Sequence, residues 1–84
     1  MNTVKGDRMR KKTIKFDSPV DALVALTKRL AKFESRFDLT SEGFFDQFTK
    51  GQLDDSEDFT EWANDYRHYM SIRRELLQRL QHAA

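Results

Sequence analysis

The chain has 84 residues, of which 35% are charged and 38% hydrophobic, and its formal net charge is +1 at pH 7. A chain of this length forms one small domain that buries too little surface to be more than marginally stable alone. The absence of cysteine excludes disulfides and thiolate metal sites and is typical of the reducing cytosol. The longest uncharged apolar run, 22–27, is too short to cross a membrane. We therefore expect a cytoplasmic domain without a membrane partner.

The charges are unevenly distributed along the chain. Residues 1–16 hold six Lys or Arg and one Asp, a net charge of +5. Residues 38–65 hold nine acids and one Lys, a net charge of −8, and residues 66–84 return to +3. Residues 1–10 lack hydrophobic periodicity, so we expect a flexible basic tail before a single small helical domain over 11–84. The separated charges predict interaction with charged partners.

Residues 11–16 alternate between apolar and polar side chains, which predicts a short β-strand. Ile14 and Phe16 share its apolar face. A single strand cannot satisfy its own backbone groups, and the pattern indicates no second strand elsewhere. The strand therefore predicts a homodimer formed through strand pairing. Its polar face carries the candidate nucleic-acid residues Lys11, Thr13 and Lys15.

Two interpretations of this polar face remain open. Two paired strands form a ribbon that enters the DNA major groove, where Lys11, Thr13 and Lys15 would contact phosphates or bases. The alternative is a solvated edge strand whose lysines discourage aggregation.

The first helix is predicted over 19–37. Ser18 is a favourable N-cap, Pro19 suits the first helical position, and Asp21 completes a capping-box pattern. Hydrophobic residues then recur with alternating spacings of three and four, which is typical of an amphipathic helix with one buried face. They are Leu23, Leu26, Leu30, Phe33 and Phe37.

The second helix is predicted over 41–50, after the N-cap Thr40. Phe44 and neighbouring phenylalanines point inward, and Gly51 ends the helix as a left-handed cap. Gly43 inside the helix lowers its stability by roughly 1 kcal/mol relative to alanine.

The third helix is predicted over 56–81, with acids in its first turn where the helix dipole favours them. At 1.5 Å per residue it is roughly 38 Å long, against roughly 28 Å for the first helix. Its C-terminal part therefore extends beyond the first helix. Because Leu76, Leu77 and Leu80 lie there, we expect helix pairing with another surface, in a dimer or a complex.

Catalytic and metal-binding functions are not predicted. The chain has neither a Gly-x-Ser-x-Gly sequence nor a glycine-rich phosphate loop, and it has only three glycines. The acids around residue 55 lack the spacing of a calcium loop. Glu61, Asp65 and His68 share a helix face without zinc-protease spacing, which favours a solvated polar face. We expect no enzyme activity, cofactor or metal.

Two groups of residues are candidates for protein binding. The acids Asp54, Asp55 and Asp58 suit a basic partner surface. The aromatic residues that follow have two interpretations, which are compatible: core residues packed against the other helices, or interface residues with one wet edge. They are Phe59, Trp62, Tyr66 and Tyr69.

The run Gly-Gln-Leu-Asp-Asp-Ser-Glu-Asp-Phe-Thr-Glu-Trp-Ala over 51–63, together with Thr-Ile-Lys-Phe-Asp-Ser-Pro over 13–19, resembles small antitoxins of bacterial and archaeal type II toxin–antitoxin pairs. The resemblance covers roughly 13–80. It implies a mostly helical fold and a role in neutralising a toxin encoded nearby. Gly43 departs from the Glu or Phe common in relatives, which implies a looser second helix.

The sequence thus predicts a mostly α, dimeric, non-enzymatic protein that binds and neutralises a cognate toxin-like partner, with DNA-binding autoregulation through the basic strand. Two alternatives remain: a ribbon-helix-helix-like DNA-binding regulator, and a helical adaptor whose third helix docks into another protein. The adaptor differs from the antitoxin in predicting that a neighbouring gene expressed alone has no effect on growth.

Overall fold

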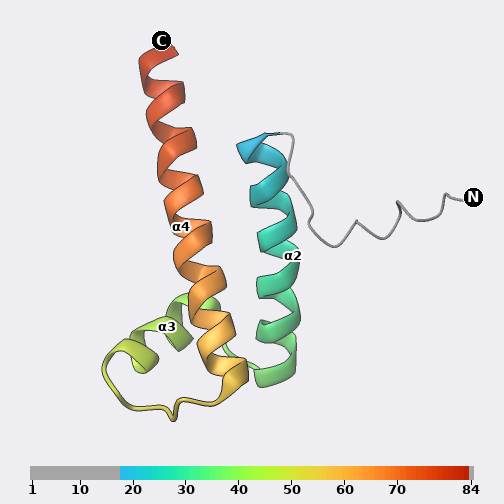
Figure 1. Cartoon of the computed structure of the whole chain (residues 1–84), viewed down its shortest axis with the longest axis vertical. Helices are drawn as coiled ribbons and strands as arrows, with labels where there is room; N and C mark the ends of the chain where they lie inside the picture. Colours follow the sequence, from blue (N-terminus) through green and yellow to red (C-terminus); the bar gives the residue numbers. More distant parts are fainter. Residues whose placement is uncertain (1–17, 84) are drawn as a thin grey trace, which may run out of the picture.

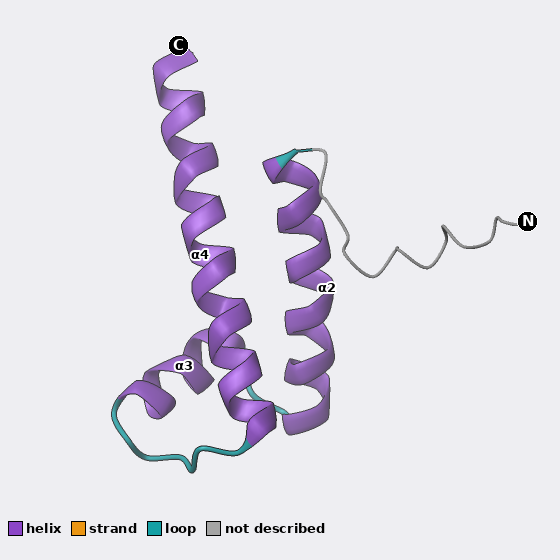
Figure 2. Ribbon diagram, viewed as in Figure 1, coloured by secondary structure: helices purple, strands orange, loops and turns teal. Residues whose placement is uncertain are grey.

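A computed structural model describes residues 18–83, which form three helices: α2 (Pro19–Phe37), α3 (Ser41–Thr49) and α4 (Glu57–Ala83). Helices α2 and α4 form an antiparallel hairpin, and α3 packs beside α4 near the closed end of the hairpin (Figure 1). All regular structure in the described range is helical (Figure 2). The mostly helical prediction is confirmed, whereas the predicted strand over 11–16 and the tail over 1–10 lie outside the described residues.

Local signals set the start and end of α2. The Ser18 hydroxyl oxygen accepts a hydrogen bond from the Asp21 backbone N–H at 3.2 Å, and Pro19 occupies the first turn. Asp38 ends the helix in the left-handed conformation, with φ of 55°, and its N–H donates to the Glu34 carbonyl. The predicted bounds of 19–37 are therefore confirmed at both ends.

Helix α3 begins and ends close to its predicted bounds of 41–50. The Thr40 hydroxyl oxygen accepts from the Gly43 N–H at 3.0 Å and caps the first turn. Gly51 adopts φ of 73°, and its N–H donates to the Phe48 carbonyl at 3.1 Å. This left-handed conformation strains any residue with a Cβ, which explains the glycine.

The long helix α4 begins one residue later and ends two residues later than the prediction of 56–81. Ser56 is its N-cap, because its hydroxyl oxygen accepts from the Phe59 N–H at 3.2 Å. A carboxylate oxygen of Asp54 accepts from the Ser56 N–H at 3.2 Å and fixes the loop before the helix. Asp54 therefore positions the N-cap residue Ser56 at the start of the helix.

The main core lies where α3 packs against the hairpin. Trp62 and Phe44 are fully buried and stack in parallel, with 3.9 Å between ring centroids and an interplanar angle of 2°. Phe33 stacks near the same indole at 5.4 Å. A second, smaller cluster joins Ala22 and Leu26 of α2 to Ile72 of α4. The core is therefore aromatic at the closed end and aliphatic towards the open end.

Ion pairs define the register of the hairpin. Arg29 pairs with Asp65 and Arg36 pairs with Asp58, so seven residues on α2 correspond to seven on α4. By this register α4 continues past the start of α2 after about Leu76, as Figure 1 shows. Between residues 18 and 83, no helix is both long enough and apolar enough to cross a membrane.

Candidate protein-binding surface

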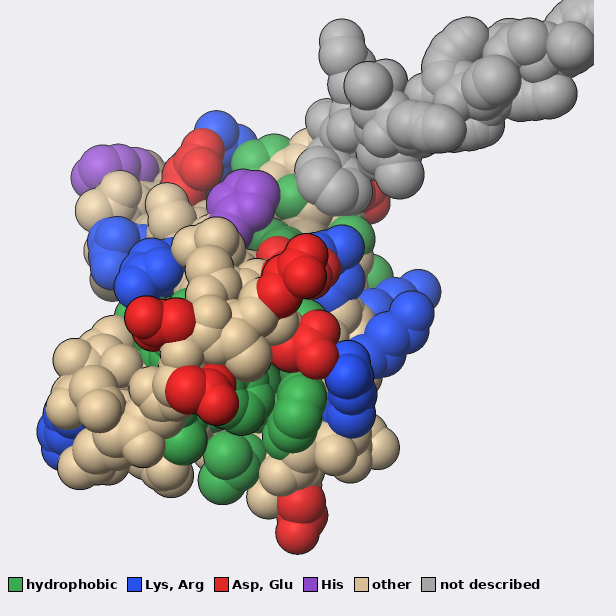
Figure 3. All heavy atoms as spheres, turned by 60° about the horizontal axis from the view of Figure 1, so that its bottom comes forward, with side chains coloured by type: hydrophobic (Ala, Val, Ile, Leu, Met, Phe, Trp, Pro, Cys, Tyr) green, Lys and Arg blue, Asp and Glu red, His purple; other side chains and the backbone are tan. Residues whose placement is uncertain are grey.

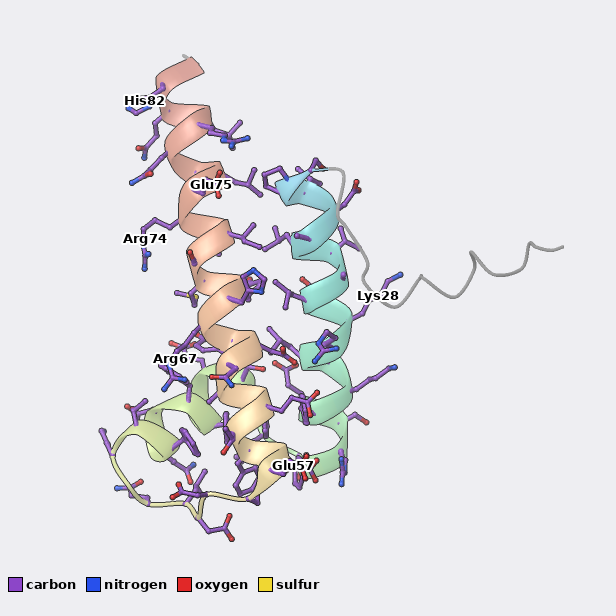
Figure 4. The ribbon with its side chains drawn as sticks, in the orientation of Figure 1. Lys28, Glu57, Arg67, Arg74, Glu75 and His82 are labelled. Atoms are coloured by element: carbon purple, nitrogen blue, oxygen red, sulfur yellow. The ribbon has the colours of Figure 1, made fainter. Side chains whose placement is uncertain are left out.

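Acidic side chains gather at the closed end of the hairpin. Several of them have no ion-pair partner among residues 18–83. We call the four at the end of α2 and around the start of α4 the acidic end, which consists of Asp38, Asp54, Asp55 and Glu57. Figure 3 turns this end forward and shows Asp and Glu side chains around a group of partly exposed hydrophobic side chains. In Figure 4, Glu57 lies at the start of α4, beside the end of α2. These carboxylates leave a concentration of negative charge open to solvent.

Other acids of the same region are engaged within the fold. Arg29 of α2 donates to Glu61 and to Asp65, each at 2.9 Å, and Arg36 donates to Asp58 at 2.8 Å. The hydrogen bond to Asp65 is the main reason why the pKa of Arg29 is raised. Glu61 and His68 remain exposed, as predicted for a solvated polar face, whereas Asp65 is largely shielded by its ion pair with α2.

The three predicted acidic contact residues thus have different environments. Asp54 and Asp55 are exposed in the loop before α4, where a partner has free access to them. Asp58 is half-buried and faces Arg36 across the hairpin. A partner that contacts Asp58 would have to compete with this ion pair.

The four predicted aromatic contact residues also differ in exposure. Trp62 has no exposed surface and belongs to the core, which is one of the two interpretations that its spacing allowed. Phe59, Tyr66 and Tyr69 are half-buried against the same core. Only these three have an edge to offer to a partner.

A buried hydrogen bond that the sequence did not predict fixes the position of α3. The Trp62 Nε1–H donates to the Ser41 hydroxyl oxygen at 2.9 Å, and Ser41 is only 3% exposed. The Ser41 N–H in turn donates to a Glu34 carboxylate oxygen at 2.9 Å. The two pairs are 21 and 7 residues apart in the sequence, and each joins two different helices. Local hydrophobic periodicity therefore cannot predict either hydrogen bond.

A hollow of about 330 Å³ lies where α2, α3 and α4 meet, and we call it the three-helix hollow. Burial, the Glu42 carboxylate and the Tyr69 side chain raise the pKa of Tyr66 in its wall, and Arg73 opposes the shift. Its walls combine apolar, aromatic and acidic side chains. They include Thr27, Leu30, Ala31, Glu42, Tyr66 and Tyr69, with Glu34 at the edge of α2.

Basic residues lie on other parts of the surface. Arg67 and Arg74 project from the side of α4 away from α2, where they line a second hollow with Phe45, and Lys28 projects outward from α2 (Figure 4). The candidate nucleic-acid residues Lys11, Thr13 and Lys15 lie outside the described residues. Among residues 18–83, no group of His, Asp or Glu is arranged to hold a metal ion.

Comparison with known proteins assigns no family to the chain. No protein-family model matches it, and no match was found among curated proteins or among solved structures.

Proposed function

We propose that this chain is a non-enzymatic, antitoxin-like protein of the cytoplasm that binds and neutralises a cognate protein encoded nearby. The acidic end is the surface that meets this partner. Toxins that act on RNA need basic surfaces, and a cluster of carboxylates complements such a surface, speeds encounter and sets register. The antitoxin resemblance of the sequence motifs around Asp54 and Trp62 supports the same role.

The observation that carries the proposal is the contrast between two sets of acids. Acids of α4 that face α2, such as Asp65, are neutralised by ion pairs with arginines of α2. Asp38, Asp54, Asp55 and Glu57 have no such cation within residues 18–83, although α2, α3 and α4 bring them to one end. Like charges held together in this way are unfavourable without a partner, since each adds to the repulsion of the others.

Co-expression with the adjacent open reading frame tests the proposal. We expect the two proteins to co-purify, and we expect the neighbour expressed alone to arrest growth. A neighbour that neither binds nor harms the cell would contradict the antitoxin function. Binding without toxicity would favour the adaptor alternative.

Matched charge variants test the surface. Asp54→Asn with Asp55→Asn removes two charges from the acidic end, and the asparagine oxygen at position 54 still accepts from the Ser56 N–H. Asp21→Asn with Glu75→Gln removes two charges elsewhere. We expect the first pair to lower the association rate constant about five- to tenfold at low salt and the second pair to leave it nearly unchanged. Equal effects of both pairs on the association rate constant would exclude the acidic end as the partner-binding surface.

The basic N-terminal region supports a second activity, DNA-binding autoregulation. Six Lys or Arg within residues 1–16 favour phosphate contacts. We expect Lys11→Ala with Lys15→Ala to weaken binding to the operator region and to lower its salt dependence by about two ion equivalents. Thr13→Ala should alter sequence preference instead. Unchanged operator binding by the lysine variant would exclude this region as the DNA-binding surface.

Pairing of residues 11–16 between two chains is the dimer proposed with this activity. Ile14→Asp with Phe16→Asp places charges on the apolar face of the predicted strand. We expect this full-length variant to sediment as a monomer at concentrations where the unchanged chain sediments as a dimer. A variant that remains dimeric would exclude strand pairing as the dimer contact.

A further inference from the structure

An exposed apolar stripe on α2 leads out of the three-helix hollow. Val20 and Val24 are 54% and 49% exposed. They lie seven residues before Thr27 and Ala31, which line the hollow. Residues seven apart occupy the same face of a helix. The stripe therefore continues the wall of the hollow towards the open end of the hairpin.

Helix α4 continues the opposite wall in the same way. Tyr66 and Tyr69 line the hollow, and Leu77 and Leu80 each follow one of them after eleven residues, three turns along the same face. These leucines are 43% and 67% exposed. Leu77 and Leu80 lie just past the start of α2, so α4 alone forms this last part of the surface. We call the hollow, together with the exposed apolar side chains that continue its two walls, the hairpin groove. From Glu34 to Val20 it spans fourteen residues of α2, roughly 21 Å.

The end of this groove near α3 is negatively charged. Glu34 is half-buried, and among residues 18–83 its carboxylate accepts one hydrogen bond, from the Ser41 N–H. Glu42 is exposed at the rim of the same hollow. Two carboxylates carry more charge than the positive groups near them, which are Arg73, acting on Tyr66 from α4, and the N-terminus of α3, whose dipole is equivalent to about half a positive charge. The hollow is therefore complementary to a cation.

The walls also define the backbone conformation of what binds. Apart from the first turn of α3, they consist of helix sides, whose own N–H and C=O groups are already paired within the helices. An extended segment would leave backbone groups without partners against such walls, whereas a helix satisfies its own. A helix laid along two helices also buries an apolar face efficiently.

A second copy of this chain fits the groove poorly. Arg73 lies four residues before Leu77 and seven before Leu80, on the same side of α4, and it has no acidic partner among residues 18–83. Two copies that met through this end would bring like charges together.

From these observations we infer that the hairpin groove binds an amphipathic helix of the partner protein, with an arginine of that helix seated between Glu34, Glu42 and the Tyr66 ring. A guanidinium stacks on an aromatic face and donates to carboxylates at the same time. Apolar residues over about the next four turns of the partner helix cover Val24 and Leu80.

Charge also fixes the direction of the partner helix. Its positive N-terminus lies near Glu34 and Glu42, and its negative C-terminus lies towards Arg73. The partner helix therefore runs parallel to α4. This inference rests on the proposed function, since it describes how the partner docks.

A set of 16-residue peptides tests the groove without the natural partner. The first peptide is an amphipathic helix with one arginine in its first turn and leucines along one face. The second carries citrulline, a neutral isostere, in place of the arginine, and the third has the same composition with its leucines spread around the helix. We expect the first to shift the amide resonances of Thr27 and Ala31 in the full chain. The citrulline peptide should bind about tenfold more weakly, and the third should not saturate.

Variants of the protein make this test specific. Glu34→Gln with Glu42→Gln should abolish the preference for arginine over citrulline, while Asp46→Asn with Glu75→Gln should preserve it. A glutamine at position 34 still accepts from the Ser41 N–H. Val24→Asp with Leu80→Asp changes exposed side chains only, and it should reduce binding of the arginine peptide at least tenfold.

Three results would overturn the inference. The first is equal binding of the arginine and citrulline peptides, and the second is resonance shifts confined to the Lys28 side of α2. The third is a change in the sedimentation of the free chain caused by Val24→Asp with Leu80→Asp, which would make a second copy the occupant. Failure of the neighbouring protein to co-purify refutes the proposed function alone, whereas failure of the peptides while the neighbour still co-purifies refutes the groove alone.

Discussion

At the scale of single residues, the hydrogen bond between Trp62 and Ser41 has the clearest energetic role. Both groups are buried, and the bond joins α4 to the first turn of α3. Ser41→Ala would leave the buried indole N–H without this acceptor. We expect the free energy of unfolding to fall by about 1–3 kcal/mol.

Urea denaturation followed by circular dichroism measures this loss. Ser71→Ala is the matched control, because Ser71 is exposed on α4, and its effect should stay within about 0.5 kcal/mol. Equal losses in the two variants would mean that the Ser41 hydroxyl contributes nothing specific.

Tyr66 makes stability depend on pH in the alkaline range. Burial, followed by the Glu42 carboxylate, raises its pKa in the folded chain. The unfolded chain ionises at the ordinary pKa of about 10, so stability is full below that pH and falls as the pH rises through the folded pKa. Glu42→Gln should move the Tyr66 ionisation to lower pH.

Tyrosinate absorbance of the folded chain, with Tyr69→Phe used to isolate Tyr66, follows this titration. Glu57→Gln, which lies away from Tyr66, is the control and should leave the curve unchanged. An unshifted curve in Glu42→Gln would show that the Glu42 carboxylate does not act on the phenol.

At the scale of elements, the helix ends depend on two left-handed residues of different type. Gly51 after α3 and Asp38 after α2 have φ of 73° and 55°. A Cβ costs about 1–2 kcal/mol in this conformation. We therefore expect Gly51→Ala to lower the free energy of unfolding by about that amount.

Asp38→Gly is the informative companion. It removes the same strain but adds freedom to the unfolded chain, so its net effect should stay within about 0.5 kcal/mol. Thermal unfolding of both variants checks this difference: Gly51→Ala adds strain to the left-handed conformation, whereas Asp38→Gly removes it. A neutral Gly51→Ala would mean that the turn after α3 relaxes to another conformation at little cost.

Gly43 lies against the N-cap of α3, which accounts for a glycine at this helical position. A Cβ built at this position would lie 3.1 Å from the Thr40 hydroxyl oxygen, the atom that caps the helix. Alanine would therefore gain helix propensity but crowd the cap. The sequence indicated only the cost of the glycine, because the cap contact depends on the geometry of the helix start.

At the scale of the whole molecule, packing decreases along α4 from the closed to the open end. Trp62 is fully buried, Ile72 is 9% exposed, and Leu80 is 67% exposed. Segments with few packing contacts open locally at little free-energy cost. We expect amides after Leu76 to exchange with solvent at least about a hundredfold faster than those between Trp62 and Tyr69.

Hydrogen exchange measured on the free chain and on its complex checks this gradient. If the partner helix fills the hairpin groove, the amides after Leu76 should become protected in the complex. Protection confined to the loop around Asp54 and Asp55 would locate the contact at the acidic end alone.

The helices themselves were largely determined by the sequence. Ser18, Thr40 and Gly51 act within one or two turns of their own positions, so their side chains and conformations define helix ends whatever surrounds them. The predicted bounds of the first two helices consequently differ from the observed ones by at most one residue. The amphipathic periodicity of α2 and α4 likewise required only local spacing.

The candidate site depended on contacts between distant residues, which no local pattern contains. Asp54 and Asp58 are four residues apart and look alike in the sequence, yet only Asp58 faces an arginine across the hairpin. Trp62 and Tyr66 are equally aromatic, yet only Trp62 is fully buried. Local hydrogen bonds and periodicity thus specified the helices, whereas the tertiary packing of α2, α3 and α4 decided which charges are neutralised and which surfaces remain open to a partner.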